Sequence, residues 1–148
     1  MIKVLSFWLS LVIAAVAIQS SAYGGEYDAK TRPAKVVWVA IYLDAKPADA
    51  RSTARGYTPG EVKVHVGDHI VFLNIDDEVH TATSRLAGAF PAAGMKPIGH
   101  TISGEWSTGD LKANAESSPL LVDKAGTYAF GCMHHFSMGQ HGTIVAQP

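Results

Sequence analysis

The sequence predicts an all-β fold, a β-sandwich of about eight short strands. Val62, Val64 and Val66 alternate with Lys63 and His65, which is the period-two pattern of a strand with one buried face. Beyond the apolar run at its N-terminus, the chain has no sustained stripe of apolar residues at helical spacing. Short β-branched and aromatic runs are instead separated by Gly, Pro and Asp, an arrangement typical of sandwiches and barrels.

The individual strands are predicted from β-branched and aromatic runs that lie between turn signals. In chain order they cover residues 36–43, 62–66, 69–74, 79–83, 119–122, 127–132 and 143–146. A Gly-Asp turn separates the second run from the third, so these two are predicted to pair as a hairpin. Trp38, Phe72 and Phe130 are expected in the core, whereas residues 84–118 show only weak periodicity and no predicted strand.

Composition and charge restrict the classes of function. The chain has 12 Lys plus Arg and 13 Asp plus Glu, so it lacks the basic excess of a nucleic-acid-binding protein. Apolar residues at 47% and aromatic residues at 9% suffice for a packed core. Cys132 is the only cysteine, which excludes an internal disulfide, a zinc site with two or more cysteines and an ordinary iron–sulfur cluster.

Residues 1–22 have the layout of a secretory signal peptide. Lys3 precedes an apolar run at residues 4–18, and Ala22 is the small residue before the predicted cleavage site. The run is shorter than the roughly 20 residues of a membrane span, so an uncleaved membrane anchor is the less favoured alternative. We therefore expect a single domain at residues 23–148, exported to the periplasm and not inserted in the membrane after cleavage.

Candidate metal ligands gather near the C-terminus. Residues 128–141 hold Cys132, three histidines and two of the four methionines. Thiolate, imidazole and thioether groups suit copper better than magnesium or calcium, and blue-copper centres combine two histidines, one cysteine and a weak axial methionine or glutamine. The segment can supply the cysteine, one histidine and the axial group. His80, which lies in a β-branched run after a strong predicted strand, is the best candidate for the second histidine.

The same residues carry a family resemblance. Residues 57–74 and 126–132 resemble the corresponding segments of small cupredoxins of the plastocyanin/amicyanin group, which are type 1, or blue, copper proteins. Cys132, His135 and Met138 have the C-x-x-H-x-x-M spacing of the amicyanin copper loop. Together with the segment around His80, the likeness covers residues 57–146, which is most of the chain after the predicted signal peptide.

The resemblance implies a Greek-key β-sandwich that binds one copper ion. By position, His80, Cys132 and His135 carry over as ligands and Met138 as the axial ligand. It also implies that the protein shuttles single electrons between larger redox partners by Cu(I)/Cu(II) cycling. We expect a monomer whose partners dock transiently on an apolar rim near His135, with Phe136 as one of its residues.

Two departures from the family pattern leave alternatives open. The segment after Met138 is two residues longer than in many relatives. Aligned on the longer loop of plastocyanins and pseudoazurins, Gln140 takes the axial position instead, and Met138 is retained because an axial thioether is the commoner choice. His134 or His141 can also replace an assigned histidine.

The second departure is Thr81, where many relatives have Asn. The Thr81 hydroxyl is expected to bond to the backbone near Cys132 and so tie the two ligand segments together.

Two other functions compete with electron transfer. The mixed His/Met loop also suits a copper storage or delivery protein, which would bind Cu(I) without colour and release it to a chelator. An enzyme with Cys132 as nucleophile and a neighbouring histidine as base would need an oxyanion hole and an orienting group, and the sequence shows no signature of either. We therefore expect that the protein is not an enzyme.

Overall fold

The computed structural model describes residues 32–43 and 55–148. The predicted signal peptide at residues 1–22 and the chain that follows it to residue 31 lie outside the described residues. So does most of the polar loop after the first strand, at residues 44–54.

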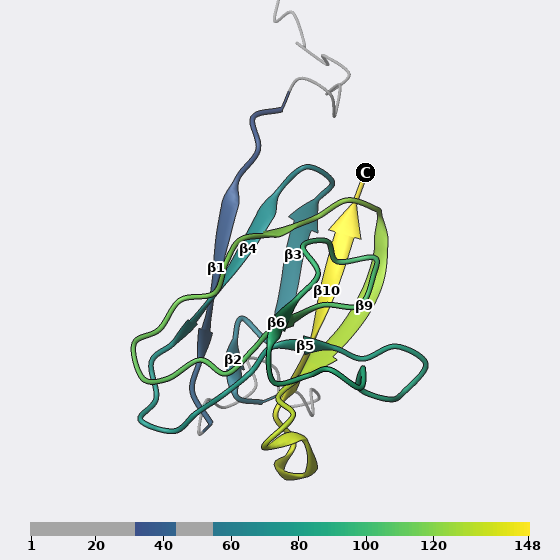
Figure 1. Ribbon diagram of the computed structural model, residues 1–148. Coiled ribbons are helices and arrows are strands. Elements are labelled where there is room, and N and C mark those ends of the chain that lie inside the picture. The colour runs from purple at the N-terminus through teal and green to yellow at the C-terminus, as the bar shows by residue number, and fades with distance from the viewer. Residues whose placement is uncertain (1–31, 44–54) are drawn as a thin grey trace, which may run out of the picture.

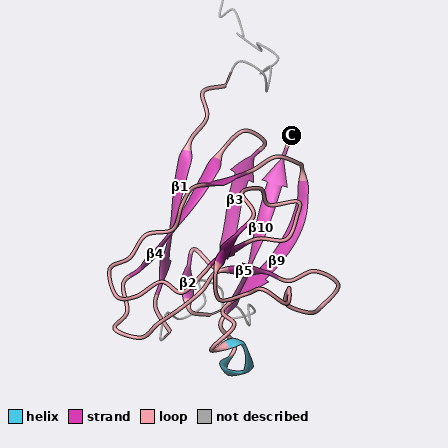
Figure 2. Cartoon of the chain, viewed as in Figure 1, coloured by secondary structure: helices cyan, strands magenta, loops and turns pink. Residues whose placement is uncertain are grey.

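Two β-sheets pack face to face in the described part of the chain, which confirms the predicted all-β sandwich (Figure 1). One sheet has the order β2-β1-β4-β8 and the other β3-β10-β9-β5-β7-β6. The strands are β1 (Val36–Ile41), β2 (Tyr57–Thr58), β3 (Glu61–His65), β4 (His69–Asn74), β5 (Thr83–Ser84), β6 (Pro97–Ile98), β7 (Ser107–Thr108), β8 (Leu120–Leu121), β9 (Gly126–Gly131) and β10 (His141–Gln147). A single 3-10 turn, η1 (Phe136–Met138), lies between β9 and β10 and is the only helix among these residues (Figure 2).

The predicted hairpin of residues 62–66 and 69–74 is wrong. β3 pairs in parallel with β10, whereas β4 pairs in parallel with β1 and antiparallel with β8. The Gly-Asp turn therefore carries the chain from one sheet to the other. β3 alternates buried and exposed residues, whereas β4 buries four of its six residues, three of them in succession. Strands that face each other across a core bury one side just as paired strands do. The pattern alone does not distinguish these two arrangements.

The described part of the chain also has more strands than predicted, and five of the ten strands found there have only two residues. β6 and β7 lie within residues 84–118, where no strand was expected. The predicted strand at residues 79–83 is reduced to β5 and to a bridge in which His80 pairs with Leu111. Pairs this short depend on the partner strand, so the local sequence gives little sign of them.

The core is built around aromatic rings from both sheets. Phe72 packs against Phe130 at 5.4 Å and against Trp106 at 5.8 Å between ring centroids, and Tyr57 lies 4.8 Å from Phe130. Phe72 and Phe130 are fully buried, as expected. Trp38 was also expected in the core, but it is 50% exposed. On β1, Val39 and Ile41 point inward, so Trp38 lies on the outer face of the sheet.

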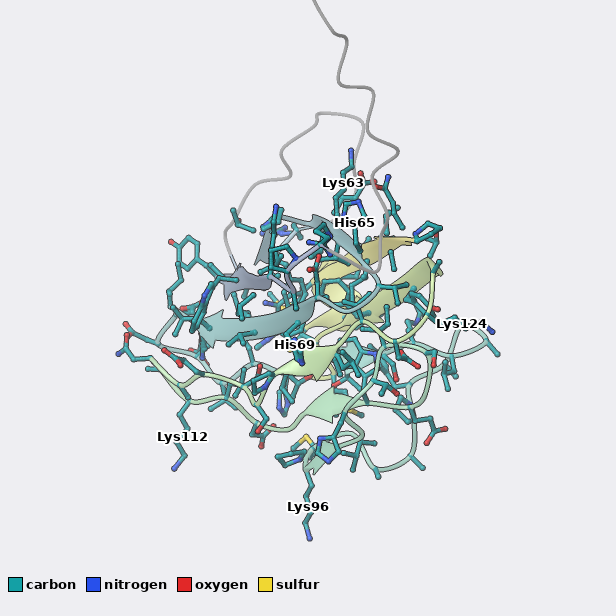
Figure 3. All side chains as sticks on the ribbon, turned by 90° about the horizontal axis from the view of Figure 1, so that it is seen from above. Lys63, His65, His69, Lys96, Lys112 and Lys124 are labelled. Carbon is teal, nitrogen blue, oxygen red and sulfur yellow. The ribbon has the colours of Figure 1, made fainter. Side chains whose placement is uncertain are left out.

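Two histidines and several lysines lie away from the loop between β9 and β10, which holds Cys132 and Gln140. His65 pairs with Gln147 at the end of β10, and His69 pairs with Val36 at the start of β1. Both histidines therefore lie at the end of the sandwich opposite the loop between β9 and β10 (Figure 1). The labelled lysines Lys63, Lys96, Lys112 and Lys124 point outward (Figure 3). Within the described residues, no helix combines the length and hydropathy that a membrane span needs.

Candidate metal centre

Three side chains from two distant segments meet at one end of the sandwich. The Sγ atom of Cys132 lies 3.8 Å from Nδ1 of His80 and 3.5 Å from Nδ1 of His135, and the two Nδ1 atoms are 3.1 Å apart. His80 and Cys132 are fully buried and His135 is half-buried. In residues 32–43 and 55–148, this is the only group of three or more His, Cys, Asp or Glu side chains close enough to hold a metal ion.

Each segment is fixed by backbone hydrogen bonds. His80 exchanges two bonds with Leu111, at 3.1 and 2.8 Å. On the other side, the N–H of Cys132 donates to the carbonyl of Gln140 at 3.0 Å, which closes the loop between β9 and β10. The carbonyl of His135 accepts bonds from Met138 and Gln140 inside that loop. The donors are therefore held by two segments that lie far apart in the sequence.

Gln140 adds a fourth donor to the group. Its side chain is fully buried, and Oε1 lies 2.9 Å from Nδ1 of His80 and 3.2 Å from Nδ1 of His135. Its Nε2 donates to the carbonyl of Gly56 at 3.3 Å, which turns Oε1 toward the histidines. Gly56 has a φ of +79°, and a Cβ there would lie 2.4 Å from Cγ of Gln140, so the glycine makes room for the amide.

The other candidate ligands lie outside this buried group. Met138 is in η1 and is 53% exposed. His134 lies at the surface with Nε2 2.8 Å from Oδ1 of Asp110. His141 packs its ring 5.7 Å from that of Phe136. The structure thus brings together His80, Cys132, His135 and Gln140. His134 and His141 are not part of this group, and Met138 is exposed on η1.

The surroundings of Cys132 favour the thiolate. Burial by itself raises the pKa of the thiol, but hydrogen bonds from His80 and from backbone N–H groups outweigh it and lower the pKa from 9.0 to about 6. One of these donors is the N–H of Thr81, 3.4 Å from Sγ. Burial lowers the pKa of His80, but its bonds with Cys132 and Asp76 raise that pKa above the usual value. At neutral pH the site therefore offers a sulfur anion, the form that binds metals.

Thr81 links the two ligand segments, as the sequence predicted. Its Oγ1 accepts a hydrogen bond from the backbone N–H of Met133 at 3.0 Å, directly after Cys132. Thr83 donates to the same oxygen at 3.1 Å. The carbonyl of Thr81 accepts the hydroxyl of Tyr57 at 2.5 Å. Thr81, the residue after His80, is thus held by hydrogen bonds to Tyr57, Thr83 and Met133.

One residue of the site was not found from the sequence. Oδ2 of Asp76 accepts a hydrogen bond from Nε2 of His80 at 3.1 Å. The only local signal is the run of carboxylates Asp76, Asp77 and Glu78 shortly before His80, and such a run is equally typical of an exposed turn.

The donor set fits copper. A thiolate, two imidazole nitrogens and an amide oxygen are the donors of type 1 copper sites. With Nε2 of His80 bonded to a carboxylate, its Nδ1 is the ring nitrogen that can bind a metal ion beside Gln140 Oε1 and Cys132 Sγ. In the metal-free protein a proton on Nδ1 bonds His80 to Cys132, and a metal ion held by this donor set would take the place of that proton.

Comparisons with known proteins agree with this chemistry. The model of the family described as copper binding proteins, plastocyanin/azurin family, matches residues 46–147. No curated protein sequence gives a significant match to the chain.

Several solved structures are similar to this one. The purple cupredoxin from Nitrosopumilus maritimus has a TM-score of 0.53 and 15% sequence identity, over 75% of this chain and 99% of that chain. A Cu(I) structure of a methionine-to-glutamine mutant of amicyanin has a TM-score of 0.51 and 20% identity, over 76% of this chain and 82% of its own. A reduced tryptophan-to-tyrosine mutant of amicyanin has a TM-score of 0.52 and 18% identity, over 80% and 88%. At these identities the likeness establishes the fold.

The family match spans well over half of the sequence, and the cofactor of this family is copper, for which His80, Cys132 and His135 could form a single site. The chain therefore belongs to the plastocyanin/azurin family of copper-binding proteins.

Proposed function

We propose that this protein is a mononuclear type 1 copper protein that carries single electrons between redox partners and is not an enzyme. The observation that supports this most directly is the convergence of Cys132 Sγ with the Nδ1 atoms of His80 and His135. Copper, when bound, supplies the one-electron Cu(I)/Cu(II) couple. The protein's part is to hold the donors in one geometry and to exclude water.

The proposed ligands are His80, Cys132 and His135, with Gln140 as the weak axial ligand in place of Met138. Gln140 is fully buried and its Oε1 faces both histidines, whereas Met138 is 53% exposed. The longer segment after Met138 explains why Gln140 rather than Met138 is buried. Met138 ends η1, and Gln140 lies two residues later, directly before β10. The axial assignment thus follows the plastocyanin-like alignment of the loop.

Rigidity of the donor set supports electron transfer over copper storage. His80 is bridged to Leu111, and Cys132 is hydrogen-bonded across the loop to Gln140. A carrier needs little rearrangement between its two oxidation states, whereas a storage protein has to release its ion. The buried positions of His80 and Cys132 favour the first role.

The proposed docking surface is the apolar rim beside His135. Phe136 follows this half-buried histidine, and the rings of Phe136 and Phe90 meet edge to face at 5.1 Å. The guanidinium carbon of Arg85 lies 3.8 Å from the centroid of Phe136. A small surface of this kind suits weak and rapidly exchanging partners.

We also propose that residues 1–22 direct export, which N-terminal sequencing of the mature protein would test.

An optical titration with Cu(II) tests the proposed function. The expected result is one equivalent of copper and an intense thiolate-to-copper band that is lost in Cys132→Ser. The band should bleach with a one-electron reductant and return with an oxidant through repeated cycles. Colourless binding of Cu(I) that a chelator readily removes would instead support storage or delivery, and no copper binding would refute both.

A further inference from the structure

We propose that Asp76 is a positioning residue for His80, and that its negative charge lowers the reduction potential of the site. This inference rests on the proposed function, because it concerns a ligand of the proposed copper centre. It is carried by the contact between Oδ2 of Asp76 and Nε2 of His80 at 3.1 Å, on the side of the ring that faces away from Cys132.

The contact fixes which nitrogen of His80 is available. A carboxylate accepts hydrogen bonds and cannot donate them, so Nε2 must carry the proton that is shared with Asp76. Nδ1 points to Cys132 and Gln140, at 3.8 and 2.9 Å, and is the nitrogen left to bind a metal ion once it gives up its proton. A carboxylate on the remote nitrogen of a ligand histidine fixes the ring orientation and strengthens the ring as a donor.

Asp76 is itself held in place from three directions. Its Oδ2 also accepts the backbone N–H of Leu43 at 2.9 Å, and its own N–H donates to Oδ1 of Asn74 at 2.9 Å. The buried Asn74 donates from Nδ2 to the carbonyls of Glu78 at 2.7 Å and Leu111 at 2.9 Å. The turn is therefore built around the buried amide, and the carboxylate has little freedom to leave His80.

The charge of Asp76 acts on a buried neighbour. The side chain of Asp76 is 15% exposed and that of His80 is fully buried, so solvent screens the pair only weakly. A carboxylate bonded to a ligand favours the more positive state of the metal, Cu(II) over Cu(I), and this lowers the reduction potential.

Asp76→Asn separates charge from position, because an amide oxygen can still accept the Nε2 proton. We expect it to raise the ratio of the Cu(II) to the Cu(I) dissociation constant about tenfold, which equals a rise in potential of about 59 mV for one electron. Asp76→Ala removes charge and acceptor together, and should also change the thiolate-to-copper band. Asp77→Asn is the matched control, since Asp77 is the exposed carboxylate next in the chain and its removal should leave the ratio within a factor of about two.

A second measurement needs no metal. In the metal-free protein at pH 8, the ring Nε2–H of His80 should appear in the ¹⁵N NMR spectrum as a protected signal. Asp76→Ala should exchange it at least ten times faster, while Asp77→Asn should not. If Asp76→Asn and Asp77→Asn shift the potential equally, or if His80 carries its proton on Nδ1 instead, the proposal is refuted. Failure of the proposed function would appear separately, as a wild-type protein that binds no copper while the Nε2–H signal still depends on Asp76.

Discussion

The Oε1 atom of Gln140 lies 2.9 Å from Nδ1 of His80, although 60 residues separate the two in the sequence. Both side chains are fully buried. The contact makes the amide part of the donor cluster, whereas the side chain of Met138 is 53% exposed. The first prediction follows from this arrangement.

Gln140→Met should raise the reduction potential, because a soft thioether favours Cu(I) more than an amide oxygen does. We expect a rise of roughly 60 mV or more, equivalent to a tenfold change in relative affinity for the two oxidation states. Voltammetry of the copper-loaded protein measures it. Met138→Leu is the matched control and should shift the potential little. The opposite result, a large shift from Met138→Leu and none from Gln140→Met, would restore Met138 as the axial ligand.

Thr81→Val should destabilise the protein by about 1–2 kcal/mol, because the N–H of Met133 then loses its acceptor. Denaturant unfolding of the metal-free protein measures the free energy change. The control is Thr127→Val, an exposed threonine on β9. We also expect Thr81→Val to alter the copper spectrum, since Thr81 connects the two ligand segments. A stability and spectrum equal to those of the control would show that the hydroxyl has no such role.

The thiol of Cys132 in the metal-free protein should ionise with a pKa of about 6 rather than the ordinary 9.0. Burial opposes ionisation, and the hydrogen bonds of His80 and the backbone overcome it. Ultraviolet absorbance of the thiolate against pH measures the midpoint, and His80→Ala should move it upward. A midpoint above pH 8 in the wild type would contradict the prediction.

This ionisation also links stability to pH. The pKa of Cys132 is lower in the folded state than in the unfolded chain, so its contribution to the free energy of unfolding is fully present above about pH 9. It is lost as the pH falls through about 6. Stability of the metal-free protein should therefore decrease from pH 9 to pH 6, and Cys132→Ala should flatten this dependence.

Phe136→Asp should slow electron self-exchange about tenfold without changing the copper spectrum, because a charge at the proposed contact surface weakens the encounter complex. NMR line broadening in mixtures of oxidised and reduced protein measures the exchange rate. Thr127→Asp adds the same charge toward the other end of β9, where Thr127 pairs with Val145, and controls for net charge. Equal rates for the two variants would argue against docking beside His135.

Much of the fold and part of the site followed from local patterns. Period-two alternation at Val62, Val64 and Val66 is a property of one strand, and it was sufficient for the all-β class. The thiolate, imidazole and thioether groups around Cys132 indicated copper, and this signal is also local because these groups lie within one loop. The spacing to His135 and the resemblance around His80 then named the three residues whose donor atoms the structure brings together.

Tertiary structure decided what depends on distant partners. The local sequences of β3 and β4 do not decide whether these two strands pair or face each other across the core. Their partners decide it, because β3 pairs with β10 and β4 pairs with β1. Trp38 points outward because its neighbours on β1 fill the core. The path of η1 exposes Met138 and turns Gln140 inward, and the turn around Asn74 brings Asp76 to His80. Alternation and spacing along the sequence show which residue types are available for the core and for the metal site. Burial and contact depend on residues far apart in the sequence, so only the packed sandwich determines which side chains come together.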